Sequence, residues 1–158
     1  MACNRRPQIG HTYVAALLLC AGRIAHQRGS SIVISLACAG VEFDQFSLVL
    51  LVTGPKDGEL DEERRAEIQD AHLNHLATLH EGGKLIGAGP LVGGAETGFR
   101  GASILNVGAD EARGLCEQDP AVEAGVFEAR VLPWLVPAGA LRYSRTTFPH
   151  SSAEAQRD

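Results

Sequence analysis

The sequence lacks the features that mark several classes of protein. The apolar stretches among the first forty residues are too short to span a membrane, so we expect no membrane partner. An excess of positive charge is also missing, because the formal net charge is −5. A protein that binds nucleic acid needs a cationic surface that displaces counterions, so we expect no nucleic-acid partner either.

Cysteines that could form a disulfide inside the main part of the chain are also lacking. Cys3, Cys20 and Cys38 lie in the first forty residues, and Cys116 is the only cysteine after them. A single cysteine cannot form a disulfide within the core, so we expect the protein to be in a reducing compartment. We predict that the protein is cytoplasmic.

Acidic residues are absent from residues 1–41, which hold four arginines. Residues 42–158 carry ten Lys or Arg against nineteen Asp or Glu, a net charge of −9. This break predicts that residues 1–40 are a leader outside the fold, that residues 41–137 form one domain, and that residues 138–158 are a C-terminal arm.

The leader allows two hypotheses. Asn4-Arg5-Arg6 followed by the apolar run Tyr13–Ala21 resembles a signal segment, although the run is interrupted after Ala21. Alternatively, the true start is Val41, and residues 1–40 are translated upstream sequence.

The pattern of residues 41–137 predicts four strands and two helices. The order strand, helix, strand, strand, helix, strand is the ferredoxin-like βαββαβ split, an α+β fold with both helices on one sheet face. The opposite face would expose apolar side chains, which predicts a face-to-face homodimer. The expected strands are 46–52, 84–91, 101–107 and 126–136, and the expected helices are 61–81 and 109–118.

Two histidines lie on the apolar stripe of the first predicted helix. His72 is either a core histidine bonded to a backbone carbonyl or a chemical group, and the spacing alone favours the core histidine. His72 and His75 could form a metal pair at i and i+3, but no third ligand completes it, so we expect no metal. The full stripe is Ile68, His72, His75, Leu76 and Leu79.

Other residues with possible chemistry give weaker signals. Gly87-Ala88-Gly89 is followed by Pro90, where a phosphate-binding helix should begin, so we expect no nucleotide cofactor. Asp119 precedes Pro120 and therefore marks a helix end or a turn. Cys116 has no histidine near it in sequence and is predicted to be an inert buried thiol.

The motifs of residues 43–137 together resemble the YciI (YCII-related) family. The resemblance implies a ferredoxin-like dimer of the dimeric α/β-barrel type, without a cofactor, in which a catalytic His–Asp pair falls on His72 and Asp119. Some members carry Ser or Thr where this sequence has Ala102, followed by Ser103. The motifs are Ala71-His72-Leu73, Gly87-Ala88-Gly89-Pro90-Leu91, Gly98-Phe99-Arg100-Gly101, Asp119-Pro120, Ala124-Gly125-Val126-Phe127 and Pro133-Trp134.

Family members resemble small-molecule enzymes, and one branch eliminates chloride from a chlorinated hydroxyquinol. The resemblance therefore implies a lyase or dehydrohalogenase in which His72 acts as general base or acid and Asp119 orients it. The alternative is a module of the same fold that binds a metabolite or a protein partner without catalysis.

Overall fold

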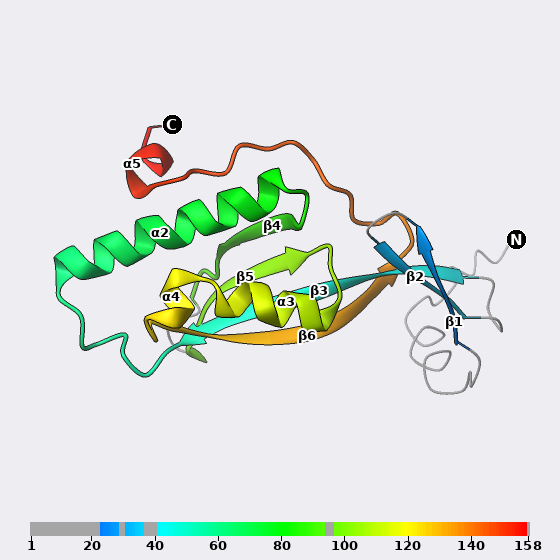
Figure 1. Cartoon of the computed structure of the whole chain (residues 1–158), viewed down its shortest axis with the longest axis horizontal. Helices are drawn as coiled ribbons and strands as arrows, with labels where there is room; N and C mark the ends of the chain where they lie inside the picture. The colour runs from blue at the N-terminus through cyan, green and yellow to red at the C-terminus, as the bar shows by residue number, and fades with distance from the viewer. Residues whose placement is uncertain (1–22, 29–30, 37–40, 94–96, 158) are drawn as a thin grey trace, which may run out of the picture.

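The computed structural model describes residues 23–28, 31–36, 41–93 and 97–157 (Figure 1). The strands are β1 Arg23–Arg28, β2 Ser31–Leu36, β3 Val41–Thr53, β4 Leu85–Pro90, β5 Phe99–Leu105 and β6 Phe127–Pro137. The helices are α2 Glu62–Glu81, α3 Ala109–Glu117, α4 Pro120–Glu123 and α5 Ser152–Ala155.

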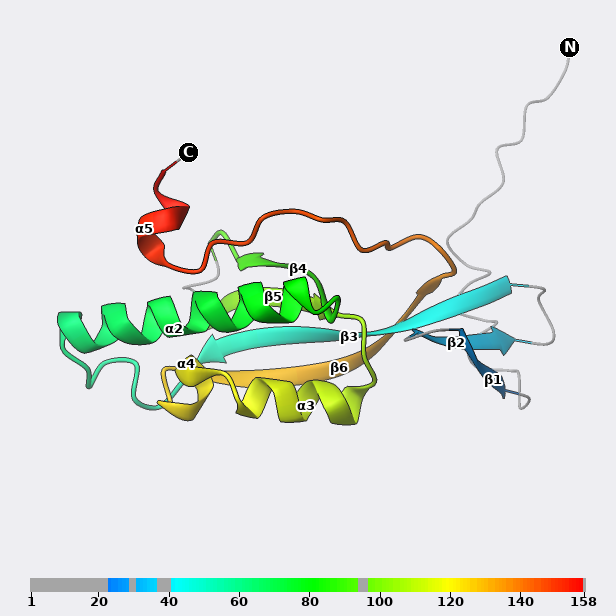
Figure 2. The ribbon, with the colours of Figure 1, turned by 45° about the horizontal axis from the view of Figure 1, so that its top comes forward.

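Four of the strands form an antiparallel sheet in the spatial order β6, β3, β5, β4. With α2 after β3 and α3 after β5, this is the ferredoxin-like βαββαβ arrangement, and the predicted fold class is confirmed. The two main helices lie on the same side of the sheet (Figures 1 and 2).

Strand β3 is longer than predicted because its N-terminal part has partners of its own. Residues 41–45 pair with β2, whereas residues 47–52 pair with β5, while β6 pairs with residues 43–53. The β1–β2 hairpin therefore extends the sheet beyond the four-stranded part. The boundary at residue 41 stays a prediction, and the apolar run Tyr13–Ala21 lies outside the described residues.

Helix α2 begins and ends where the sequence predicts. Asp61 is the N-cap, and its Oδ1 accepts a hydrogen bond of 2.8 Å from the Arg64 amide. Glu62 and Glu63 add negative charge at the positive end of the helix dipole. Gly83 follows the last turn with φ of 72°, a left-handed conformation that glycine adopts without strain.

The core lies between the sheet and the two main helices. Val49, Leu105 and Leu85 are almost completely buried, and Ala112 of α3 packs against them. Leu76 and Leu79 of α2 pack against the same cluster, as their places on the predicted stripe require. Burial of this apolar surface is the main force that holds both helices to one sheet face.

The opposite sheet face is apolar and, among the described residues, has no helix over it. Strand pairing puts Leu48, Ile104 and Leu132 side by side, and Trp134 lies opposite Phe46. Leu132 and Trp134 keep 47% and 38% of their surface exposed. This is the apolar surface that the sequence predicted.

A backbone joint connects the end of β3 to the start of β6. The Gly54 amide donates to Val126 O at 2.8 Å, and the Lys56 amide donates to Gly125 O at 3.0 Å. A Cβ atom at Gly54 would overlap the Gly125 backbone. The two main chains therefore touch directly, which only glycine at position 54 allows.

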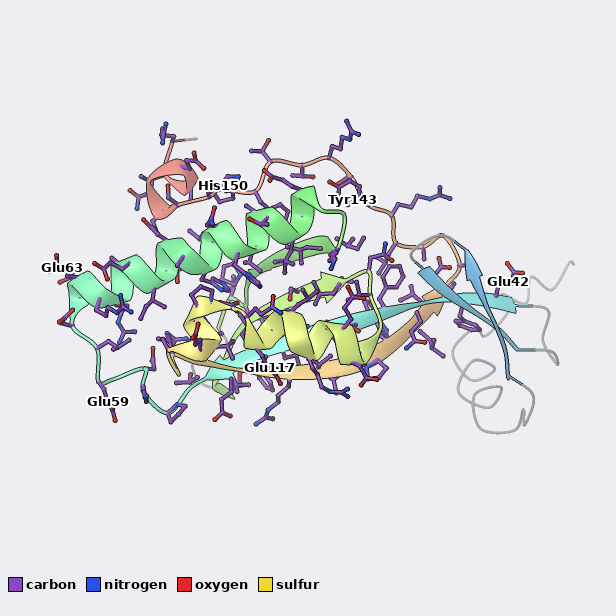
Figure 3. All side chains as sticks on the ribbon, in the orientation of Figure 1. Glu42, Glu59, Glu63, Glu117, Tyr143 and His150 are labelled. Atoms are coloured by element: carbon purple, nitrogen blue, oxygen red, sulfur yellow. The ribbon has the colours of Figure 1, made fainter. Side chains whose placement is uncertain are left out.

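The arm, residues 138–157, runs along α2 in the opposite direction (Figures 1 and 2). The Ser152 amide donates to Asp70 Oδ1 at 2.8 Å. The ring nitrogens of His150, labelled beside α2 in Figure 3, lie 2.8 Å from Asn74 Oδ1 and 3.1 Å from Glu81 Oε1. Hydrogen bonds from Ser152 lower the pKa of Asp70, so this carboxylate accepts from the arm down to acidic pH.

Candidate functional site

The structure brings His72 and Asp119 into direct contact. His72 Nδ1 lies 2.9 Å from Asp119 Oδ1 and 2.7 Å from Oδ2, and the two residues are 6% and 4% exposed. Because a carboxylate oxygen accepts, Nδ1 carries the proton and donates. Nε2 is then left with a lone pair that can take a proton from another molecule.

Asp119 is held by a short helix that the sequence interpretation missed. Its backbone forms the N-cap of α4, its Oδ1 accepts from the Ala121 amide at 2.9 Å, and Pro120 is in the first helical position. The sequence predicts a helix end or a turn at Asp119-Pro120. The same dipeptide is also a helix start, because Asp caps well and Pro has no amide hydrogen to lose.

Apolar side chains lie next to the pair. Ile68, one turn before His72 on α2, packs with Ala121 and Val126, and all three are buried. The Phe127 ring meets the His72 ring edge-on, at a centroid distance of 5.7 Å and an angle of 70°. Low polarity around the pair strengthens the attraction between the Asp119 carboxylate and a positive charge on His72.

His75 reaches a different acceptor. Its Nε2 lies 3.1 Å from the carbonyl oxygen of Leu115, which can only accept, so Nε2 donates. The two histidines therefore bind separate groups and do not converge. The described ranges contain no group of three His, Cys, Asp or Glu residues that could hold a metal ion.

Comparison with known proteins identifies the family of the chain. Residues 48–135 match the YCII-related domain, which covers more than half of the chain. The chain belongs to the YCII-related family. Protein YciI of Escherichia coli O6:H1 is 35% identical over 74 residues, which cover 42% of this chain and 74% of that protein. Protein YciI of Shigella flexneri gives the same figures.

Within the YCII-related domain, a narrow cavity of about 20 Å³ adjoins Asp119. His75, Ser103 and Cys116 contribute to its wall, and the other lining residues are apolar. The volume has room for about one water molecule. Ser103 faces this cavity, whereas Ala102 points to the other sheet face beside Leu50.

Cys116 is half-buried, whereas the sequence predicts a buried thiol. Burial raises the pKa of its thiol to about 11, and the negative charges of Asp119 and then Glu117 add to the effect. At neutral pH the thiol is therefore protonated and a poor nucleophile. The Asp119 side chain that adds to this effect is also the partner of His72.

A second buried histidine of α2 was not singled out by the sequence. His80 is 3% exposed, and its Nδ1 donates to Leu85 O at 2.9 Å. The rings of Tyr143 and Phe148 lie on it at centroid distances of 4.9 and 4.4 Å. Nε2 of His80 is buried and has no hydrogen-bond partner among the residues that the structure describes. Both aromatic residues lie beyond the YCII-related match, in the arm.

A larger hollow lies beside His80, at the C-terminal end of α2 and far along the helix from His72. It measures about 510 Å³ and is open to solvent. Its lining residues come from the end of α2 and from the arm: His80, Glu81, Gly82, Gly83, Tyr143, Arg145, Thr146 and Thr147. The larger hollow therefore lies away from the His72–Asp119 pair.

No helix in the part of the chain that the structure describes is long and apolar enough to cross a membrane.

Proposed function

We propose that this YCII-related protein is a small-molecule enzyme, a cofactor-independent lyase or dehydrohalogenase that uses His72 and Asp119 for general acid/base chemistry. The observation that carries the proposal is the buried contact between His72 Nδ1 and both oxygens of Asp119. That contact fixes the tautomer in which Nε2 is the base.

The pair supplies what an elimination needs. Nε2 of His72 takes a proton from a hydroxyl or an acidic C–H group of the substrate, and the electrons released form the new double bond as the carbon–chlorine bond breaks. Chloride leaves with the bonding electrons. Asp119 stabilises the imidazolium that forms, and Ala121 keeps the carboxylate in place.

The test is turnover of a panel of chlorinated hydroxyquinols and related enolisable compounds by the full chain. Chloride release is measured for wild type, His72→Gln, Asp119→Asn and the control His150→Gln, whose ring lies on the arm. We expect a loss of roughly 10²- to 10⁴-fold for both pair variants and little change for the control. Equal turnover by wild type and His72→Gln would overturn the proposed chemistry.

A second candidate is a metabolite-binding module without catalysis. The observation that favours it is the volume of the hollow beside His80, which is within the range of small-molecule sites, whereas the cavity at Asp119 holds about one water. Saturable binding of a metabolite that Arg145→Gln weakens and His72→Gln does not, without turnover, would favour the module.

Two further properties belong to the same proposal. A second copy of the chain covers the apolar sheet face that carries Leu132 and Trp134, because an exposed apolar surface of this kind marks an interface. Sedimentation equilibrium checks this, and a single-chain mass would contradict it. The protein acts in the cytoplasm, where Cys116, a free thiol, stays reduced.

A further inference from the structure

His75 lies one helical turn after His72 on α2, but its ring contacts another helix. The only hydrogen bond that the structure gives this side chain runs from Nε2 to Leu115 O, at 3.1 Å, across 40 residues of sequence. Helix α2 thus carries the proposed base, His72, and also a donor, His75, that bonds to the end of α3. The end of α3 leads directly to Asp119, the partner of His72.

Leu115 is in the last turn of α3, where carbonyl groups have no partner within the helix. His75 supplies a partner for this one. The next carbonyl, that of Cys116, accepts from the Asp119 amide at 3.1 Å. Two hydrogen bonds therefore fix the chain just before Asp119, one local and one from α2.

Packing alone does not fix this region, because the cavity of about 20 Å³ lies among His75, Cys116 and Asp119. A segment beside free volume can shift, and a shift of about 1 Å would take the 2.7 Å contact between His72 and Asp119 out of hydrogen-bond range. Directional bonds must then hold Asp119 at its distance from His72.

We propose that His75 is a positioning residue, which ties the end of α3 to α2 so that Asp119 stays within reach of His72. This role explains why two histidines occupy i and i+3 without sharing a ligand: one makes the contact with Asp119, and the other fixes the backbone that brings Asp119. The expected effect of His75 on turnover rests on the proposed function, but its effect on the contact between His72 and Asp119 does not.

The experiment reads the His72–Asp119 contact directly, by nitrogen-15 NMR of the imidazoles in the full chain. The Nδ1–H signal of His72 and its protection from exchange report whether the proton is donated to Asp119. The variants are His75→Leu, which removes the donor, and His75→Gln, whose side-chain amide can still donate to a carbonyl. Thr78→Ala is the matched control, because it removes one hydrogen bond of α2, to Asn74 O, that touches neither α3 nor the pair.

We expect His75→Leu to lose the protected Nδ1–H signal, while His75→Gln and Thr78→Ala keep it. A His75→Leu protein that is folded and retains the signal would overturn the proposal. Loss of the signal in Thr78→Ala as well would also overturn it, because the effect would then be general to α2.

Where turnover is found, His75→Leu should lower kcat by roughly 10²-fold with KM little changed, and His75→Gln should restore most of it. If no compound turns over but the NMR result holds, the positioning role stands and the proposed enzyme function fails. The two failures are therefore distinguishable.

Discussion

Two buried histidines of α2, His72 and His80, show how one helix can give the same side chain two different environments. Both donate from Nδ1 and keep a lone pair on Nε2. His72 donates to a carboxylate, which stabilises a proton added at Nε2. His80 donates to a neutral carbonyl, and its Nε2 is covered by rings of the arm. The partner of Nδ1 and the access to Nε2 both differ, and both favour His72 over His80 as the base of the proposed function.

The largest difference is expected when each histidine is replaced by leucine. His72→Leu leaves the Asp119 carboxylate 4% exposed without its partner, which we expect to lower the free energy of unfolding by about 3–4 kcal/mol. His80→Leu loses one hydrogen bond but also removes a buried unpaired nitrogen, and should cost about 1 kcal/mol or less. Urea denaturation measures both values.

Equal losses of unfolding free energy in His72→Leu and His80→Leu would contradict this expectation, because the Asp119 carboxylate would then make no difference to the replacement of His72. Asp119→Asn combined with His72→Leu serves as the control. Without the Asp119 charge, the loss of unfolding free energy caused by His72→Leu should fall toward the loss caused by His80→Leu.

A smaller effect is expected at Cys116, which senses the charge of Asp119. Because burial, Asp119 and Glu117 raise the pKa of this thiol to about 11, iodoacetamide should react slowly at neutral pH and faster as the pH rises toward 11. Asp119→Asn removes a negative charge, lowers the thiol pKa and should speed the reaction at a given pH. An unchanged rate in a folded Asp119→Asn protein would mean that Asp119 is not ionised.

The smallest effect concerns the arm that covers His80. Hydrogen bonds from Ser152 lower the pKa of Asp70, so their stabilising contribution is present above the unfolded value of 3.8 and is lost as the pH falls through the folded value. At neutral pH, Asp70→Asn should speed amide hydrogen exchange at Ser152 slightly. This difference from wild type should disappear once acid protonates Asp70, and a difference that persists there would contradict the assignment.

Much of the fold could be predicted because the local signals agree with it. Asp61 and Gly83 bound α2, and the apolar strands and glycine-rich turns gave the order of elements. The contact between His72 and Asp119, 47 residues apart, came from the family resemblance and not from periodicity. Sequence spacing cannot show which residues of different elements meet.

The environment of His80 could not be predicted for a different reason. Tyr143 and Phe148 cover it from a segment without helix or strand periodicity, so no sequence pattern indicated that they contact His80. His80, eight positions after His72, falls on the same stripe of α2, which is a weak signal that its side chain is buried. The hairpin β1–β2 was also missed, since the charge break at residue 41 indicated a boundary and did not reveal strand pairing.

The joint between Gly54 and Gly125 has a consequence for how sequences of this kind can diverge. Two main chains in contact leave no side chain between them, so substitution elsewhere cannot adjust their separation. The joint lies beside Val126, which packs against Ile68 and Ala121 around the His–Asp pair. Relatives should therefore vary more at the exposed loop residues Gly58 and Glu59 than at the joint, where the spacing should stay constant.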